Sequence, residues 1–441
     1  MKSTRSVLMC LSVLLSFNPC SQAENYPYKS DYLWVAVPDH DNWVYAVGEK
    51  AVVEIMFFKY GIPQEATVEY EIADEACQAD VRGILELKKG RAVLDAGTVS
   101  MPRFRDIRLA LRLDGVTYRH HVKIGFSPEK IQPYTQEPDD FRAWWDSLLT
   151  DNKRYPLRSS RELYTPYCTD KVDCYLVRLE VNRSRQAFYG FLFYPKNATK
   201  GGHPVVLTPP GAGIKANRVA DSKNYYPENG CIRFVIEIHG MNPTHSEAVF
   251  EDVRRAFDGR VKGYLYQGLN HLDHYYMKHV YLGLVKCIDY LTSLPEWDGI
   301  NVAVQGGSQG GGLALVAAGL DARVTQCIVN HPALSDMARA ATGGVSGYPH
   351  FSGKDGFLTP AHLKTMAYYD VVNFARYVQA KTFMTWGFND DTCPPTTSYA
   401  VWNTLKGNKE SLITPINEHW TSESTNRLQL DWLLQNRIIN K

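Results

Sequence analysis

A serine in a glycine-rich segment is the first residue whose surroundings predict chemistry. Residues 301–312 read NVAVQGGSQGGG, which places Ser308 at the centre of a G-x-S-x-G pattern. The apolar residues before the pattern predict a strand, and residues 310–320 predict a helix after it. A sharp strand-to-helix turn of this kind lifts a nucleophilic serine clear of the sheet. The helix N-terminus also directs the amide of Gln309 at the site, where it would stabilise a developing oxyanion.

A nucleophilic serine needs a general base, and behind such a turn the order along the chain is serine, acid, histidine. Residues 387–395, GFNDDTCPP, follow a predicted strand and contain the adjacent carboxylates Asp390 and Asp391. Only one of the 13 histidines, His419, comes after this segment. We therefore expect His419 to be the base. Spacing does not choose between Asp390 and Asp391, and a third carboxylate, Asp336, is more simply explained as a helix cap or loop partner.

The second oxyanion donor is expected on the turn that follows the strand beside the nucleophile strand. Residues 205–208 predict that strand and lead into PPGAG, so the amide of Ala212 is the candidate. His239 and His331 each end another predicted strand and are candidate substrate-binding residues. Ordinary hydrogen bonding would explain such histidines as simply.

No metal site or cofactor is predicted. His271 and His274 have an H-x-x-H spacing, but no third ligand or motif glutamate accompanies them. The expected reaction, acyl transfer through a serine ester, needs no cofactor.

Strands and helices that alternate beyond residue 160 must position these residues. Continuous apolar runs predict strands buried on both faces of a parallel sheet at 205–208, 232–238, 302–305, 324–330 and 382–386. They follow a predicted hairpin (175–181 and 187–194), and helices are predicted at 276–294 and 310–320. The fold class is therefore α/β, a three-layer α/β-hydrolase sandwich whose active site lies at the carboxyl ends of the strands.

The preceding hundred residues read differently. Short β-branched and aromatic runs predict strands at 43–47, 51–60, 66–72, 92–95, 106–113 and 116–124, separated by turns at 48–49, 88–90 and 114–115. This pattern predicts a small all-β, immunoglobulin-like sandwich with a packing or accessory role. The expected organisation is a signal peptide (1–23), the sandwich (24–126), a linker with a connecting helix from Asp139 (127–160) and the catalytic domain (161–441).

The first residues predict export. A basic start and a short apolar run end in Ser21-Gln22-Ala23, which suits cleavage near Ala23 and a secreted or periplasmic protein. A lipid anchor at Cys20 is the alternative. No segment is long enough to span a membrane. The net charge of +1, from 48 basic and 47 acidic residues, gives no reason to expect nucleic acid as a partner.

Seven cysteines follow the leader, an odd number without a metal-ligand spacing. One local disulfide, between Cys168 and Cys174, is compatible with their position at the approach to a strand. The other five are expected to be buried thiols.

Several of these segments together resemble the acetyl xylan esterase and cephalosporin-C deacetylase family of carbohydrate esterases, over about residues 126–441. The resemblance is carried by Tyr275-Tyr276, LTSLPE at 291–296, GGSQGGGLAL at 306–315 and the acid loop at 387–395. It implies that Asp390 is the catalytic acid and that the substrate is an acetylated polysaccharide or oligosaccharide. Homo-oligomers are also common among related esterases.

The chain departs from the family pattern at three places around the expected site. His239-Gly240-Met241 stands where the family has R-G-Q, and Pro210-Gly211-Ala212 stands where it has H-G-Y. Glu418-His419-Trp420 replaces G-H-E, which makes Trp420 a further candidate substrate contact. All three places adjoin the expected site, where they would affect the acyl size and the leaving group that it accepts.

Two other functions share part of this pattern. A serine peptidase of the prolyl-oligopeptidase kind has the same motif and residue order, but its usual N-terminal propeller needs several hundred residues. A carbohydrate-binding protein that has lost catalysis would not need the complete set of serine, acid and histidine.

Overall fold

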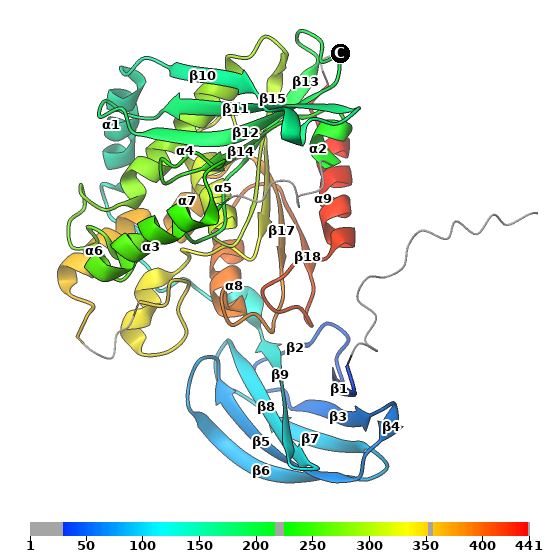
Figure 1. Ribbon diagram of the computed structural model, residues 1–441. Helices are drawn as coiled ribbons and strands as arrows, with labels where there is room; N and C mark the ends of the chain where they lie inside the picture. The colour runs from blue at the N-terminus through cyan, green and yellow to red at the C-terminus, as the bar shows by residue number, and fades with distance from the viewer. Residues whose placement is uncertain (1–29, 217–224, 352–355, 440–441) are drawn as a thin grey trace, which may run out of the picture.

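The chain folds into an N-terminal β region and a larger α/β region, which lie at opposite ends of the molecule (Figure 1). The structure is a computed structural model that describes residues 30–216, 225–351 and 356–439 of the 441. Strands β1–β9 make up the N-terminal β region, and the elements from β10 to α9 make up the α/β region.

Two sheets share one apolar core in the N-terminal β region. One contains β1 (Tyr32–Pro38), β3 (Ala51–Lys59), β4 (Ile62–Pro63) and β7 (Arg91–Gly97); the other contains β2 (Val44–Tyr45), β9 (Val116–Phe126), β8 (Arg103–Leu113), β5 (Ala66–Asp74) and β6 (Ala79–Leu87). Alternate residues of β3, from Ala51 to Phe57, are buried in this core because successive side chains of a strand point to opposite faces. Asp114 and Gly115, with φ of 52° and 79°, form the tight β8–β9 turn that the sequence predicts.

The six predicted strands of this region are all present, but three further strands were not predicted. They are β1, β4 and β6. Most side chains of β6 are exposed or half-buried, so its sequence, ADVRGILEL, lacks the alternation that marks a strand with one buried face. The predicted strand at 43–47 is only two residues long, and it pairs with β9 in parallel.

The α/β region is built on a sheet that has nine strands in the described part of the chain. Their order is β10 (Arg158–Leu163), β11 (Val172–Glu180), β12 (Ala187–Pro195), β14 (Ile232–Glu237), β13 (His203–Thr208), β15 (Trp297–Gly307), β16 (Gln326–Asn330), β17 (Lys381–Trp386) and β18 (Lys409–Ile413). The strands from β14 to β18 in this order are parallel to one another, whereas β10, β11 and β12 pair antiparallel. The predicted central strands and the predicted hairpin are confirmed.

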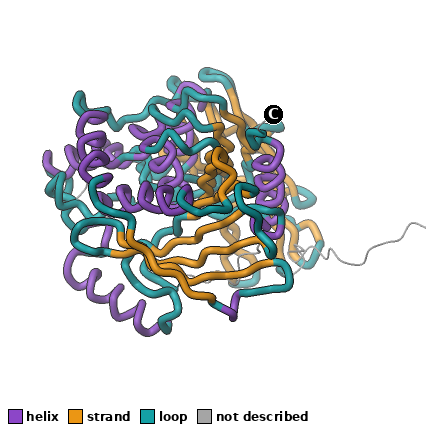
Figure 2. The backbone as a smooth tube through the Cα atoms, turned by 90° about the horizontal axis from the view of Figure 1, so that it is seen from above, coloured by secondary structure: helices purple, strands orange, loops and turns teal. Residues whose placement is uncertain are grey.

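Helices cover both faces of this sheet, which gives three layers (Figures 1 and 2). One face packs against α1 (Phe141–Lys153), α3 (Glu247–Val261), α4 (Met277–Thr292), α5 (Gln309–Leu320), α6 (Pro360–Tyr369), α7 (Val371–Ala375) and α8 (Pro395–Thr404). The other face packs against α2 (Tyr225–Glu228) and α9 (Glu423–Gln435). Successive side chains of β15 point to opposite faces of the sheet. Val302 and Val304 pack in the core under the larger group of helices, and Ala303 packs in the core under α2 and α9.

The connection between the regions runs through residues 127–140 into α1, close to where the sequence predicts a helix. Trp145 of this helix is fully buried and donates its indole N–H to the carbonyl of Tyr368 at 3.0 Å, so it packs the helix into the core. The edge strand β10 begins at Arg158, whereas we expected the catalytic part to start at 161. All six residues of β10 are exposed, so no apolar pattern marks the strand.

Cys168 and Cys174 are free thiols, so the disulfide between them is absent. The Cys174 N–H donates to Cys168 Sγ at 3.3 Å instead. No helix among the described residues is long and apolar enough to cross a membrane. The expected leader, with Cys20 and Ala23, lies outside the described residues.

Candidate active site

Ser308 lies on a strained turn between β15 and α5. Its backbone has φ 58° and ψ −126°, which a non-glycine residue rarely adopts and which costs on the order of 1–3 kcal/mol. A Cβ on Gly306 would lie 2.3 Å from the Gly310 carbonyl oxygen, and one on Gly310 would lie 2.6 Å from that of Pro209. The glycines on either side of the serine are therefore required by space, as the G-x-S-x-G pattern predicts.

Asp390 and His419 meet at the carboxyl ends of the strands. His419 Nδ1 lies 2.8 Å from Asp390 Oδ2, and the other carboxylate oxygen accepts the N–H groups of Thr392 and Cys393, each at 2.8 Å. Asp390 is fully buried, whereas the Asp391 side chain is 74% exposed and forms an ion pair with Lys123. The structure therefore brings Asp390, and not Asp391, to the histidine.

The third carboxylate considered, Asp336, lies in a different environment. Its buried side chain accepts the N–H groups of Tyr134 and Thr135, both at 2.8 Å, at the N-terminus of the 3₁₀ helix η6 (Met337–Thr342). Asp336 is thus a loop partner that holds the connection between the two regions.

The Ser308 hydroxyl contacts the buried thiol of Cys393, whose pKa is raised far above its usual range by burial. Within the described residues the hydroxyl makes no hydrogen bond with His419. Catalytic hydrogen bonds often form only when substrate is bound, so this geometry is compatible with a serine–histidine relay.

His331 packs directly against the candidate base. The centres of the His331 and His419 rings are 4.4 Å apart, and a Cβ on Gly307 would lie 3.6 Å from His331 Nε2. Burial, followed by the neighbouring His419, lowers the pKa of His331 to about 4. His331 is therefore a neutral ring in the wall of the site.

The two candidate oxyanion donors come from neighbouring parallel strands. β13 pairs with β15, and the turn after β13 places Pro209 against the first turn of α5, where Gln309 begins the helix. Ala212 is half-buried on that turn. The turn and the helix thus approach one another as a two-sided oxyanion site requires.

Tyr264 connects these two segments and was not predicted. Its hydroxyl accepts the Gly213 N–H at 3.2 Å and donates to Gln309 Oε1 at 2.5 Å. Tyr264 lies in the short 3₁₀ helix η5 (Tyr264–Tyr266), outside the motifs that the sequence analysis uses. No sequence signal could have identified it, because its partners are 45 and 51 residues away.

His239 lies beside the oxyanion turn and lines a cavity together with it. Its Nδ1 is 2.8 Å from the Tyr276 hydroxyl, its ring lies edge-on to Tyr264, and burial lowers its pKa to about 3. The loop that it begins is held by Glu237, whose carboxylate accepts the N–H groups of His239 at 2.8 Å and Met241 at 2.9 Å. Trp420, the last candidate contact, is 49% exposed beside His419.

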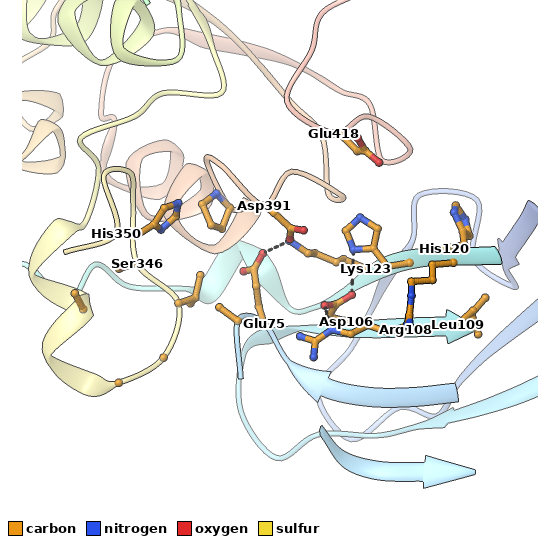
Figure 3. A pocket seen from close by; sticks show the side chains of 18 of the residues that line it. Glu75, Asp106, Arg108, Leu109, His120, Lys123, Ser346, His350, Asp391 and Glu418 are labelled. Carbon is orange, nitrogen blue, oxygen red and sulfur yellow. Dashed lines mark hydrogen bonds and ion pairs between the residues drawn. The ribbon is translucent and has the colours of Figure 1, made fainter. Parts of the chain in front are cut away.

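A cavity of about 830 Å³ lies between the N-terminal β region and the α/β region (Figure 3). Strands β8 and β9 contribute charged side chains to one wall, and residues next to Asp390 and His419 contribute to the other. The lining includes Asp106, Arg108, Arg119, His120, His121, Ser346, His350, Phe351, Asp391 and Glu418. The cavity therefore borders the candidate site through the neighbours of its acid and its base.

Comparison with known proteins agrees with this geometry. Residues 127–436 match the family model described as acetyl xylan esterase (AXE1). Acetyl esterase Axe7A of Xylanibacter ruminicola is 51% identical over 429 residues, which cover 97% of this chain and 96% of that protein.

Two solved structures have the same fold. The acetyl xylan esterase from Paenibacillus sp. R4 superposes with a TM-score of 0.61 at 24% identity, covering 70% of this chain and 98% of its own. Acetyl xylan esterase 1 from Thermoanaerobacterium sp. JW/SL YS485 gives 0.61 at 23% identity, with 70% and 97% coverage. The chain belongs to the acetyl xylan esterase family and is a carboxylic ester hydrolase.

Proposed function

We propose that this protein removes acetyl groups from acetylated xylan or its oligosaccharides, with Ser308, His419 and Asp390 as its catalytic residues. The observation that carries the assignment is the 2.8 Å contact of the buried Asp390 with His419, on the loops beside the Ser308 turn. Family membership favours ester hydrolysis over the peptidase and binding-protein alternatives.

The reaction proceeds through an acyl-enzyme. His419 takes the proton of Ser308 as the hydroxyl oxygen attacks the acetyl carbonyl, and Asp390 stabilises the imidazolium through Nδ1. The amides of Gln309 and Ala212 bind the oxyanion. His419 then gives its proton to the departing sugar oxygen, which leaves as a hydroxyl, after which water, activated by the same histidine, hydrolyses the acetyl-serine ester and releases acetate.

The sugar chain occupies the cavity between the two regions, in this proposal. The cavity borders Asp391 and Glu418, the neighbours of the acid and the base, and its lining is rich in groups that hydrogen-bond hydroxyls and carboxylates. His331, which packs against His419, and Trp420, which follows His419 along the chain, are candidate substrate contacts. His239 lies beside the oxyanion turn.

The protein is secreted or periplasmic in this proposal, because its first 23 residues have the composition of a signal peptide. The region before residue 127 is a separate immunoglobulin-like domain, followed by a linker with a connecting helix and by a catalytic domain that begins with β10 at Arg158. The shared core of the two N-terminal sheets supports this division.

Substitution of the nucleophile and the base tests the catalytic assignment. Ser308→Ala and His419→Ala should each lower kcat/KM on p-nitrophenyl acetate by roughly 10⁴-fold or more, because each breaks the relay. Ser424→Ala, at an exposed position in α9, is the matched control and should behave as wild type. Near-normal turnover by either triad variant would refute the assignment.

Acetate release from a panel of acetylated glycans tests the substrate. Acetylated xylo-oligosaccharides should release acetate faster than aminoacyl-peptide substrates, measured in parallel, lose their peptide bonds. Preferential cleavage of peptides would favour the peptidase alternative.

A further inference from the structure

One lysine of the N-terminal β region reaches into the α/β region and holds the loop of the candidate acid. Lys123, in β9, is 1% exposed. Its ammonium donates to the Asp390 carbonyl oxygen at 3.0 Å and to Glu75 Oε1 at 3.0 Å, and it lies 2.7 Å from Asp391 Oδ1. Figure 3 shows Lys123 between Glu75 and Asp391 at the edge of the cavity.

The backbone of the same residue makes a further contact. The Lys123 N–H donates to Asn389 Oδ1 at 2.9 Å, and the Asn389 amide donates to the Ile416 carbonyl at 3.2 Å. These two hydrogen bonds therefore link β9 to the acid loop, and the acid loop to the loop that carries His419. Residues 389, 390 and 391 are all held by Lys123.

Glu75 completes the attachment. It is 4% exposed, its second carboxylate oxygen accepts the Thr396 N–H at 3.3 Å, and burial raises its pKa. Thr396 lies in the first turn of α8, directly after the acid loop. The Phe104 ring adds an apolar contact with Phe388, at a centroid distance of 5.0 Å.

A buried ion pair is not in itself a means of stabilisation. Removing two charges from water costs several kcal/mol per ion, and apolar replacements of the same volume are often equally stable. This ion pair instead fixes positions. The Lys123 ammonium has three N–H donors, and it holds the Asp390 carbonyl and the carboxylates of Glu75 and Asp391 in one arrangement.

We propose that Lys123 is a positioning residue for Asp390, so that the N-terminal β region completes the geometry of the catalytic acid. The inference rests on the proposed role of Asp390. Lys123 contacts the main chain of Asp390, while the carboxylate faces His419. Loss of the lysine contact would let the acid loop move relative to the histidine, and a displacement of about 1 Å can cost up to about 10²-fold in rate.

The double variant Glu75→Gln/Lys123→Met tests this inference without leaving a charge buried alone. We expect kcat on p-nitrophenyl acetate to fall about 10- to 100-fold with KM changed less than about 2-fold, because binding is unaffected while the acid is misplaced.

A rescue variant separates positioning from general loss of structure. Glu75→Gln/Lys123→Gln retains an amide that can donate to the Asp390 carbonyl, so it should recover part of kcat. Asp114→Asn, which removes the exposed partner of Lys59 elsewhere in the N-terminal β region, is the control and should leave kcat and KM unchanged.

The inference is wrong if the Glu75→Gln/Lys123→Met protein is folded by circular dichroism and keeps wild-type kcat while Ser308→Ala is inactive. Activity in Ser308→Ala would instead refute the proposed function. Should the double variant not fold, Asn389→Ala supplies the test, because it removes the contact with the Lys123 N–H. It should lower kcat with little change in KM, and a wild-type kcat would overturn the inference.

Discussion

Tyr264 joins the two segments that carry the candidate oxyanion donors. Its hydroxyl accepts from the turn after β13, at Gly213, and donates to Gln309 at the start of α5. The Tyr264 ring also packs edge-on against His239, whose low pKa keeps the imidazole neutral at working pH. The spacing of the two oxyanion amides thus depends on a side chain that contacts neither acyl carbon nor nucleophile.

Tyr264→Phe should lower kcat on p-nitrophenyl acetate about 2- to 10-fold, the effect of losing hydrogen bonds worth about 0.5–1.5 kcal/mol. KM should change little, because the oxyanion forms only in the transition state. Tyr275→Phe is the matched control, since the buried Tyr275 hydroxyl has no hydrogen-bond partner among the described residues. Equal kcat in the two variants would contradict a positioning role for Tyr264.

At the scale of elements, the end of β14 shows how the chain replaces a family motif. Where the family has R-G-Q, this chain has His239-Gly240-Met241, and the loop turns around Glu237. Gly240 has φ 77°, which glycine adopts without strain. Two backbone hydrogen bonds to one buried carboxylate therefore hold the loop beside the oxyanion turn.

Burial of Glu237 makes stability depend on pH. Burial raises the Glu237 pKa to about 7, above the ordinary value of about 4.3, so the folded state binds a proton more tightly than the unfolded state. The stability that this group contributes is therefore present below about pH 4.3 and is lost as the pH rises toward 7.

Urea unfolding of wild type and Glu237→Gln between pH 5 and pH 8 measures this effect. The free energy of unfolding of the wild type should fall, relative to the variant, by up to about 3 kcal/mol as the pH rises. Glu228→Gln, at an exposed position in α2, should show no such trend. A difference that stays constant with pH would mean that Glu237 is charged throughout.

At the scale of the whole molecule, the N-terminal β region and the α/β region enclose one cavity. Arg119 of β9 lines it, and its guanidinium forms no ion pair or hydrogen bond with any described residue. Arg108, by contrast, donates from Nε to Asp106 Oδ2 at 2.7 Å. Arg119 is therefore the lining cation most available to a bound sugar chain.

Arg119→Ala should raise the KM for acetylated xylo-oligosaccharides about 3- to 10-fold relative to the KM for p-nitrophenyl acetate, because only the longer substrate reaches the β9 wall. Arg112→Ala, an exposed arginine of β8 outside the cavity lining, provides the control. An unchanged ratio of the two KM values would show that the sugar chain does not occupy this cavity.

The sequence by itself determined the central strands, the three-layer order and the strained turn at Ser308. These features follow from local chemistry: continuous apolar runs mark strands buried on both faces, and glycine spacing marks a turn that no Cβ could enter. His419 could also be identified from the sequence, because it is the one histidine that follows the acid loop.

Strands with little apolar burial could not be predicted. β6 and β10 lie at the ends of their sheets and present mainly polar or exposed side chains. Their pairing comes from backbone hydrogen bonds to β5 and β11, which are independent of side-chain pattern.

Only the tertiary structure distinguished Asp390 from Asp391 without reference to a family. Adjacent residues on a loop are equivalent in spacing, and burial and the Lys123 contact separate them. Glu75, Lys123 and Tyr264 were likewise invisible in the sequence, because their partners lie between 45 and 321 residues away along the chain. Contacts over such separations depend on tertiary packing within and between the two regions, which no local pattern encodes.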